Sequence, residues 1–290
     1  MRSMLFLPAD SEKKIAKGKG TNADGLILDL EDSVALPRKA EGRRLAREFL
    51  DANPRESRSK NILVRVNPLC GDMTLGDLAA VIGGAPDYVL LPKYRTRADV
   101  ITLDNYISAL EVREGLPLGQ TKILVIGTET GQALFNLGDL AGASERLSHV
   151  SWGEFDLSAD VGAETHLLPD GGWDDLFRTA RSLCLAAAAA AEIEACNTVF
   201  TDFKDDKGLE DAARGARRAG FTGMMAIHPN QVDIINEVFS VSEKELEWSR
   251  RVVEVFDNNP DLGVVGLDGI MLDKPHYTQA MRVIARAKAH

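Results

Sequence analysis

The sequence has few cysteines and no motif built from them. Its three cysteines, Cys70, Cys184 and Cys196, show neither CxxC nor CxxH spacing. An odd, unpatterned set of this kind indicates neither a disulfide framework nor a zinc site. The 290-residue chain also has a net charge of −10 and no dense basic patch. This acidic balance argues against nucleic-acid binding.

Long apolar runs are absent as well. The most apolar helix-like stretch, residues 183–191, is rich in alanine and lies between Arg181 and Glu192. It is well short of the ~20 residues that cross a bilayer. Met1 and Arg2 lead directly into a strand-like run and not into a leader of signal-peptide form. We therefore expect a cytoplasmic protein with no membrane partner.

The apolar residues that are present suffice for a large core. They make up 44% of the chain beside 27% charged residues, a balance typical of globular enzymes. Apolar runs span residues 4–7, 25–30, 62–66, 88–91, 122–126, 149–152, 196–200 and 222–227, and helix-like segments lie between them. Eight strands alternating with helices predict a (β/α)8 TIM barrel over residues 1–235, with its site at the carboxyl ends of the strands.

The helix-like segments carry start and stop signals. They span residues 10–19, 37–50, 99–115, 173–195 and 209–219. An Asp-Ser pair suited to capping starts the first segment, Pro37 opens the second, and Gly220 closes the last. These signals support the alternation of strands with helices.

Residues 236–290 are not needed to close a barrel, and we expect them to form a C-terminal extension. Ser242 and Glu245 form a capping box for a helix through Phe256. An extended piece over 264–272 and a terminal helix from Pro275 follow. We expect this extension to be a helical lid segment or a subunit contact.

Two carboxylates follow successive predicted strands. The run 123–126 leads to Glu129, and the run 149–152 leads to Asp156, with glycine close to each. Side chains at the carboxyl ends of neighbouring parallel strands point into one crevice, where such sheets bind ligands. Mg²⁺ prefers oxygen ligands of this kind and keeps water or substrate in its other positions. Either residue alone is more simply a helix N-cap, but the two together favour a metal site.

Further charged residues follow the second, third and fourth strands. Asp29, Glu31 and Asp32 occur in quick succession, and a strand period of two puts Asp29 and Glu31 on one side. Arg65 lies inside an apolar run, where it either meets an internal carboxylate or awaits an anionic ligand. Lys93 is equally compatible with steering a ligand's phosphates and with a solvated position on the rim.

A series of short motifs, each occurring once, extends along nearly the whole chain. They are Arg2-Ser3-Met4-Leu5-Phe6-Leu7-Pro8, Asp29-Leu30-Glu31-Asp32-Ser33-Val34, Arg65-Val66-Asn67, Pro92-Lys93, Glu129-Thr130, Gly153-Glu154-Phe155-Asp156-Leu157, Ala226-Ile227-His228-Pro229-Asn230-Gln231 and Asp268-Gly269-Ile270-Met271-Leu272-Asp273. Each motif alone is weak. The ordered set resembles the citrate lyase beta subunit-like proteins of the aldolase/citrate lyase family, which includes malyl-CoA and citramalyl-CoA lyases.

The resemblance implies a barrel of the phosphoenolpyruvate/pyruvate-domain type and a Mg²⁺-dependent carbon–carbon lyase of the oxo-acid-lyase type. Such an enzyme cleaves or condenses a 3-hydroxyacyl-CoA thioester, and the fragments are an acyl-CoA and a 2-oxo acid or oxaloacetate. Relatives are commonly trimers or hexamers, so a homotrimer or a hexamer is implied as well.

The resemblance also implies roles for individual residues. By matching position, Glu129 and Asp156 would bind the metal, and Glu129 would border the substrate together with Arg65 and Lys93. Arg65 would contact the substrate's oxygen atoms and take part in catalysis.

Three more acidic residues would complete the catalytic set. Glu31 and Asp32 would lie near the metal's water shell. Asp273 would supply acid/base chemistry, in relatives often from a neighbouring subunit.

Two positions depart from the family pattern. Met224 stands where many relatives have lysine, and Asn197 stands where many have aspartate. Neither departure removes an implied metal ligand, so we expect activity with an altered or unknown substrate. Two rival functions remain open: a citrate lyase beta subunit that acts on a carrier-protein thioester only within a multi-subunit complex, and a non-catalytic oxo-acid-binding relative.

Overall fold

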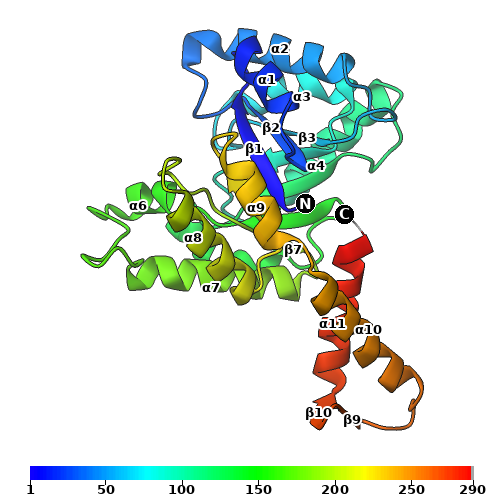
Figure 1. The fold of residues 1–290 in the computed structure, drawn as a ribbon. Coiled ribbons are helices and arrows are strands. Elements are labelled where there is room, and N and C mark those ends of the chain that lie inside the picture. Colours follow the sequence, from blue (N-terminus) through cyan, green and yellow to red (C-terminus); the bar gives the residue numbers. More distant parts are fainter. Residues whose placement is uncertain (289–290) are drawn as a thin grey trace. The chain divides into compact units, whose positions relative to one another are not determined.

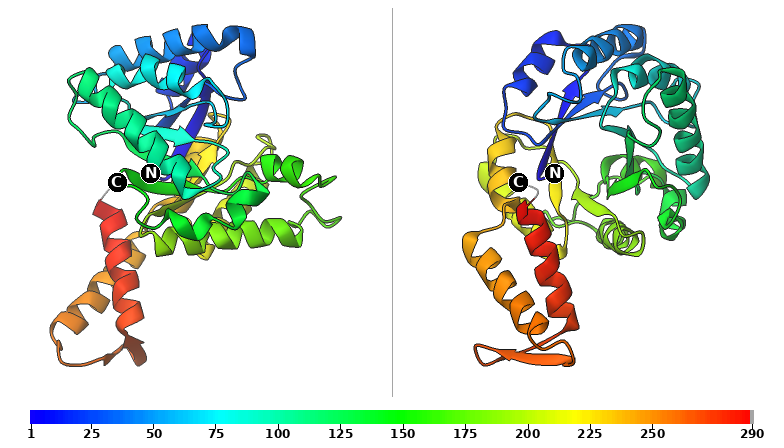
Figure 2. Two further views of the ribbon diagram at one scale, coloured as in Figure 1. Left: turned by 180° about the vertical axis from the view of Figure 1, so that it is seen from behind. Right: turned by 90° about the vertical axis from the view of Figure 1, so that its right-hand side faces the viewer.

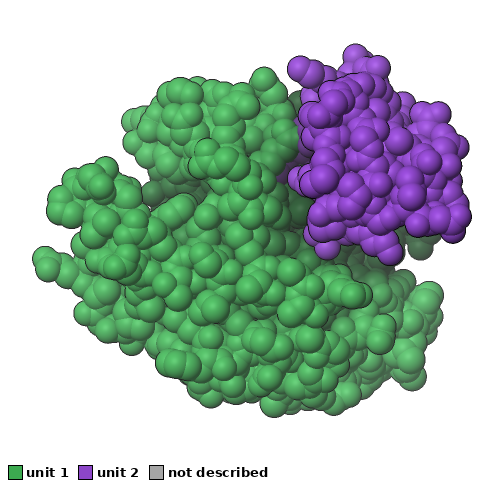
Figure 3. All heavy atoms as spheres, turned by 90° about the horizontal axis from the view of Figure 1, so that it is seen from below, with its two compact units in different colours: residues 1–238 green, residues 239–290 purple. Residues whose placement is uncertain are grey.

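The computed structural model describes residues 1–288 and divides the chain into two compact units. The first unit runs from Met1 to Val238 and the second begins at Phe239. Figure 3 colours the two units separately. Each unit is described by itself below.

The first unit contains a closed barrel of eight parallel strands, which confirms the predicted fold class (Figure 1). The last strand pairs with the first and closes the ring, with Ser3 opposite Met224. The strands are β1 (Ser3–Pro8), β2 (Gly25–Asp29), β3 (Asn61–Arg65), β4 (Tyr88–Leu91), β5 (Lys122–Ile126), β6 (Leu147–Ser151), β7 (Glu194–Asn197) and β8 (Gly223–Ala226).

Apolar side chains fill the barrel. Met4, Ile27, Leu63, Leu90 and Leu124 come from five successive strands and belong to one buried cluster. A TIM barrel is a packed core and not a pore, so its functional groups sit at the strand ends.

Helices surround the ring of strands, as the right-hand view of Figure 2 shows. Pro37 lies in a 3-10 turn that precedes the helix expected to begin there, and Gly220 closes α8 in the left-handed conformation. The helices and 3-10 turns are α1 (Glu12–Lys19), η1 (Leu36–Arg38), α2 (Lys39–Asp51), α3 (Thr74–Val81), η2 (Ile82–Gly84), α4 (Arg97–Arg113), α5 (Gly131–Leu134), η3 (Leu137–Leu140), α6 (Phe155–Val161), α7 (Asp175–Ala190), α8 (Asp206–Ala219) and α9 (Gln231–Phe239).

The seventh strand begins and ends earlier than the apolar run 196–200 predicts. It covers Glu194–Asn197, and its last residue accepts a hydrogen bond from the Trp152 indole N–H at 2.8 Å. The following residues leave the ladder, and the Phe200 carbonyl accepts instead from the Gln231 side-chain amide at 2.7 Å. Side-chain partners from neighbouring segments therefore replace strand pairing over the second half of the run.

The second unit contains α10 (Glu243–Asp257), a two-stranded antiparallel hairpin of β9 (Val264–Leu267) and β10 (Ile270–Asp273), and α11 (Lys274–Lys288). The Ser242 hydroxyl caps α10 by accepting from the Glu245 amide at 3.2 Å. The predicted extended piece is in fact a hairpin, because Asp268 and Gly269 both adopt positive φ, at 51° and 78°. None of the helices in the described residues is long and apolar enough to cross a membrane.

A buried ion pair joins α4 to the start of β6 in the first unit. Arg146 Nη1 and Nη2 donate to the two carboxylate oxygens of Glu111 at 2.9 and 2.6 Å. Glu111 also accepts from the amides of Gly119 and Thr121 at 2.8 and 2.9 Å. The Glu111 side chain is fully buried, so its charge depends on these donors.

We expect Glu111→Ala to lower the free energy of unfolding by about 3–5 kcal/mol, because it leaves the Arg146 guanidinium buried without its main counter-ion. Chemical denaturation followed by circular dichroism measures the change. Glu41→Ala is the matched control, since it breaks an exposed pair with Arg44 on α2 and should change stability little. Equal losses in the two variants would contradict a special role for the buried pair.

Candidate functional site

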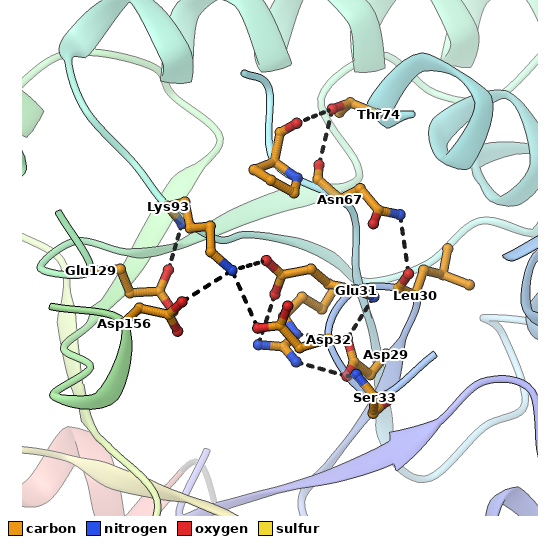
Figure 4. A network of polar contacts seen from close by, with 12 residues as sticks. Asp29, Leu30, Glu31, Asp32, Ser33, Asn67, Thr74, Lys93, Glu129 and Asp156 are labelled. Carbon is orange, nitrogen blue, oxygen red and sulfur yellow. Dashed lines mark hydrogen bonds and ion pairs between the residues drawn. The ribbon is translucent and has the colours of Figure 1, made fainter. Parts of the chain in front are cut away.

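The predicted site residues of the first unit converge at the carboxyl ends of β2 to β6 (Figure 4). Asp29 and Arg65 are the last residues of β2 and β3 and lie opposite each other in the strand register. Lys93, Glu129 and Asp156 lie in the segments that follow β4, β5 and β6. The parallel barrel brings these side chains together because its strands all end on the same face.

Arg65 meets internal carboxylates, which is one of the two outcomes its sequence position allows. Its Nε and Nη2 each lie 2.7 Å from an oxygen of Asp29, in a two-pronged pair. Its Nη1 lies 3.0 Å from Glu31 Oε2. Burial would lower the pKa of Arg65, but the Asp29 hydrogen bonds and charge outweigh burial and raise it. The same pairing outweighs burial at Asp29 and lowers the pKa of that carboxyl.

Lys93 does not occupy a solvated rim position. Its ammonium lies 2.5 Å from Glu31 Oε1 and 3.2 Å from Asp32 Oδ2 and Asp156 Oδ1 (Figure 4). Burial would lower the pKa of Lys93, but its contacts with Glu31 and the other carboxylates raise it. Burial raises the pKa of Glu31, and the charges of Arg65 and Lys93 oppose that rise.

Glu129 is a buried carboxyl, with 4% of its surface exposed. Its Oε2 accepts a hydrogen bond from the Lys93 backbone N–H at 2.5 Å. Burial raises the pKa of Glu129 to about 8, and the charge of Asp156 adds to that rise. Gly153 allows this packing, since a Cβ there would lie 3.2 Å from Glu129 Cγ. A buried carboxyl with a raised pKa, beside a second acid, is a group that a cation would stabilise in its charged form.

Neither Glu129 nor Asp156 is the N-cap of a helix. Thr130 caps α5 by accepting from the Ala133 amide, and Glu154 stands at the N-cap position of α6. Asp156 lies within the first turn of α6, and 33% of its side chain is exposed. The simpler explanation for these two carboxylates is therefore wrong in this fold.

The donor set fits Mg²⁺ better than a softer metal. In residues 1–288 no group of three or more His, Cys, Asp or Glu side chains is arranged to hold a metal. The acidic oxygen donors of the site are carboxylates, and Asp156 lies close enough to Glu129 for its charge to raise the pKa of Glu129. Two carboxylates with open remaining positions suit an ion that retains water or substrate ligands.

The remaining predicted residue, Asp273, lies in the second unit. It ends β10, and its Oδ1 lies 2.5 Å from His276 Nδ1 in the first turn of α11. The Asp273 side chain is 46% exposed. These contacts give Asp273 a local partner within its own unit.

Sequence reasoning missed the residues that support this cluster. Lys39 on α2 donates to the carbonyls of Leu30 and Glu31 at 2.6 and 2.7 Å and to Asn67 Oδ1 at 2.7 Å. Asn67 in turn donates to Asp77 at 2.7 Å from its side chain and from its backbone. The Arg65-Val66-Asn67 motif singles out Asn67, but the sequence does not predict its hydrogen-bond partners.

Glu154 is a second buried carboxyl that the sequence did not single out. It has 4% of its surface exposed, and its Oε2 has no hydrogen-bond partner among the described residues. Burial raises the pKa of Glu154 to about 7, although the Thr198 hydroxyl partly opposes the rise. The Gly153–Leu157 motif contains the residue, and only its burial in the fold sets it apart.

The closed barrel with acidic and basic groups at its strand ends is that of a TIM-barrel enzyme. The family described as HpcH/HpaI aldolase/citrate lyase matches residues 2–229, and a family described as C-C bond lyase of the TIM-barrel fold matches residues 176–290. The chain therefore belongs to the HpcH/HpaI aldolase/citrate lyase family, a family of lyases. This confirms the resemblance that the ordered motifs indicate.

The sequence similarity to individual members of the family covers almost the whole chain. The citrate lyase subunit beta of Escherichia coli strain K12 is 35% identical over 99% of this chain and 93% of its own length. A (3S)-malyl-CoA thioesterase of Cereibacter sphaeroides strain ATCC 17025 is 32% identical over 99% of this chain and 95% of its own. The crystal structure of CitE from Mycobacterium tuberculosis with magnesium, acetoacetate and coenzyme A is 31% identical, with a TM-score of 0.77 over 99% of this chain and 98% of that one.

We expect the metal-free protein to lose stability as the pH rises through the pKa of Glu129. Burial raises this pKa from its ordinary value of 4.5 to about 8, so the folded state binds more protons than the unfolded state between these values. Stability therefore falls as the pH rises across this window. Urea denaturation in EDTA at pH 6 and pH 9 measures the difference.

Glu129→Gln should flatten this part of the pH dependence, because its amide carries no titrating proton. Glu56→Gln, at an exposed carboxyl, is the control and should retain the wild-type profile. Identical profiles for wild type and Glu129→Gln would show that Glu129 is ionised in the folded protein well below pH 8.

Proposed function

We propose that this protein is a Mg²⁺-dependent lyase that cleaves, or in reverse forms, the carbon–carbon bond of a 3-hydroxyacyl-CoA thioester. The products of cleavage are an acyl-CoA and a 2-oxo acid or oxaloacetate. The observation that carries this proposal is the convergence of Glu129 and Asp156 with the cations Arg65 and Lys93 at one face of the barrel. Family membership and the ligands of the Mycobacterium CitE structure support it.

We assign Glu129 and Asp156 as the metal ligands, with Glu31 and Asp32 beside the metal's water shell. When bound, the ion supplies Lewis acidity and a template for the oxo acid's carboxylate and adjacent oxygen. Glu129 is buried and borders the substrate. The partly exposed Asp156 lies toward the open side.

Arg65 acts on the thioester fragment. Cleavage moves the electron pair of the broken bond onto this fragment, so negative charge develops on the thioester oxygen. Arg65 offsets that charge, and its pairing with Asp29 holds the guanidinium in place beforehand. Lys93 steers the anionic groups of the substrate toward the same crevice.

Asp273 performs the acid/base step. It removes the hydroxyl proton of the substrate as the carbon–carbon bond breaks, and it returns a proton to the carbon of the acyl fragment. We assign this residue to a neighbouring subunit of a homotrimer or hexamer, working in the cytoplasm. Its half-exposed side chain supports such a role.

A rival function is that of a beta subunit that acts on a carrier-protein thioester only within a larger complex. The similarity to proteins named citrate lyase subunit beta favours it. A second candidate reaction is hydrolysis of the thioester, because relatives named (3S)-malyl-CoA thioesterase match over the same span. Hydrolysis releases free CoA without breaking the carbon–carbon bond, so the two reactions differ in their products.

We expect the purified protein with Mg²⁺ to cleave at least one of malyl-, citramalyl-, 3-hydroxy-3-methylglutaryl- and citryl-CoA. Chromatographic detection of the oxo acid and the acyl-CoA measures cleavage, and free thiol measures hydrolysis. EDTA, Glu129→Ala and Asp156→Ala should each abolish turnover, because they remove the metal or one of its two ligands. Glu56→Ala, at an exposed carboxyl, is the control and should keep full activity.

The outcomes of this assay separate the candidates. Turnover that persists in EDTA would contradict metal dependence. Free thiol without oxo acid would favour the thioesterase. Activity only after a carrier protein and a transferase are added would favour the dependent subunit.

We expect Asp273→Asn and Glu129→Ala subunits, each inactive alone, to recover activity when they are mixed and allowed to exchange. If Asp273 serves a neighbouring barrel, about a quarter of the sites in an equal mixture contain both intact residues. Activity after co-refolding, with light scattering to give the oligomeric state, measures the recovery. No recovery in mixed oligomers would place Asp273 in the barrel of its own subunit.

A further inference from the structure

One residue contacts both carboxylates that we assign to the metal. The backbone N–H of Lys93 donates to Glu129 Oε2 at 2.5 Å, and its ammonium lies 3.2 Å from Asp156 Oδ1. Lys93 also has a φ of 51°, in the left-handed region that residues other than glycine rarely adopt. Its amide and its side chain reach the same cluster from this conformation.

The charges around Lys93 make it the cation that balances Asp156. Among the described residues, the ion pairs of Arg65 are with Asp29 and Glu31. Within the described residues, Asp156 forms its ion pair with Lys93. The Lys93 ammonium therefore supplies the positive charge beside the Asp156 carboxylate.

A second cation at Asp156 would meet the charge of Lys93 at short range. Like charges repel strongly where solvent is partly excluded, and 25% of the Lys93 side chain is exposed. The lysine stem is flexible, and Glu31, at 2.5 Å, offers the ammonium a nearer carboxylate than Asp156 does. Lys93 can thus leave Asp156 without losing its main partner.

We propose that the Lys93 ammonium is an internal counter-ion that a divalent cation displaces from Asp156, and that Lys93 thereby lowers the affinity of the site for the metal. After displacement the ammonium stays with Glu31 and Asp32. This inference rests on the proposed function, because it takes Asp156 as a metal ligand. It adds a residue that sets metal affinity without being a ligand.

The test is the Mg²⁺ affinity of Lys93→Met, measured by isothermal titration calorimetry at pH 8.5 and low ionic strength. Methionine removes the charge but keeps the stem and the backbone N–H to Glu129. We expect the dissociation constant for Mg²⁺ to fall about tenfold. The Mg²⁺-induced rise in melting temperature should be larger in Lys93→Met than in wild type. Lys93→Arg, which keeps the charge, should stay close to wild type.

Lys60→Met is the matched control. Lys60 precedes β3, at the opposite end of the barrel, and its ammonium contacts the carbonyls of Thr21 and Ala23. Removing this charge should leave the Mg²⁺ affinity unchanged. If Lys60→Met tightened Mg²⁺ binding as much as Lys93→Met, the effect would be one of net charge and the inference would be overturned.

Two further outcomes keep the inference and the proposed function apart. If the wild type binds Mg²⁺ and Lys93→Met binds it equally well or more weakly, the inference alone is overturned. Wild-type protein that binds no Mg²⁺ overturns both. A crystal structure of the wild type with Mg²⁺ gives an independent test that needs no variant. We expect Lys93 Nζ beyond about 4 Å from Asp156 and still paired with Glu31.

Discussion

The arrangement of charge at the open face of the barrel depends on the pair between Arg65 and Asp29. Their strands place them side by side in register, and the planar guanidinium meets the carboxylate with two donors at 2.7 Å. A carboxylate as buried as Asp29 would take up a proton without such a partner. The pair instead keeps it ionised, and it fixes the guanidinium beside Glu31.

The other carboxylates of the cluster differ in the partners that hold them. Glu31 is shared between Arg65 and Lys93, while the ion pairs of Asp32 and Asp156 within residues 1–288 are with the ammonium of the flexible Lys93. Rigid groups suit orientation of a substrate, and loosely held charges suit exchange of a ligand. The site therefore combines a fixed cation with carboxylates that can change partners.

The barrel and the convergence of its acids followed from the sequence because both depend on local patterns. Apolar runs bounded by proline, glycine or charge set the strands, and parallel alternation with helices leaves one face for their carboxyl ends. The hairpin after Val264 was a different case. The Asp268-Gly269 pair is a strong turn signal, and treating the run as one extended piece overlooked it.

Partner choice could not be predicted in the same way, because it depends on which side chains the closed barrel brings within reach. Lys39 is one of several basic residues on an amphipathic helix, and only the fold directs it to two carbonyls and Asn67. The Lys93 ammonium pairs with Glu31, Asp32 and Asp156, from a left-handed backbone conformation that the sequence pattern does not predict. The strand pattern predicts where a charged side chain lies along the chain, whereas the balance between burial and ion pairing determines the pKa of that side chain. For Glu129 that balance leaves a protonatable acid at the proposed metal site.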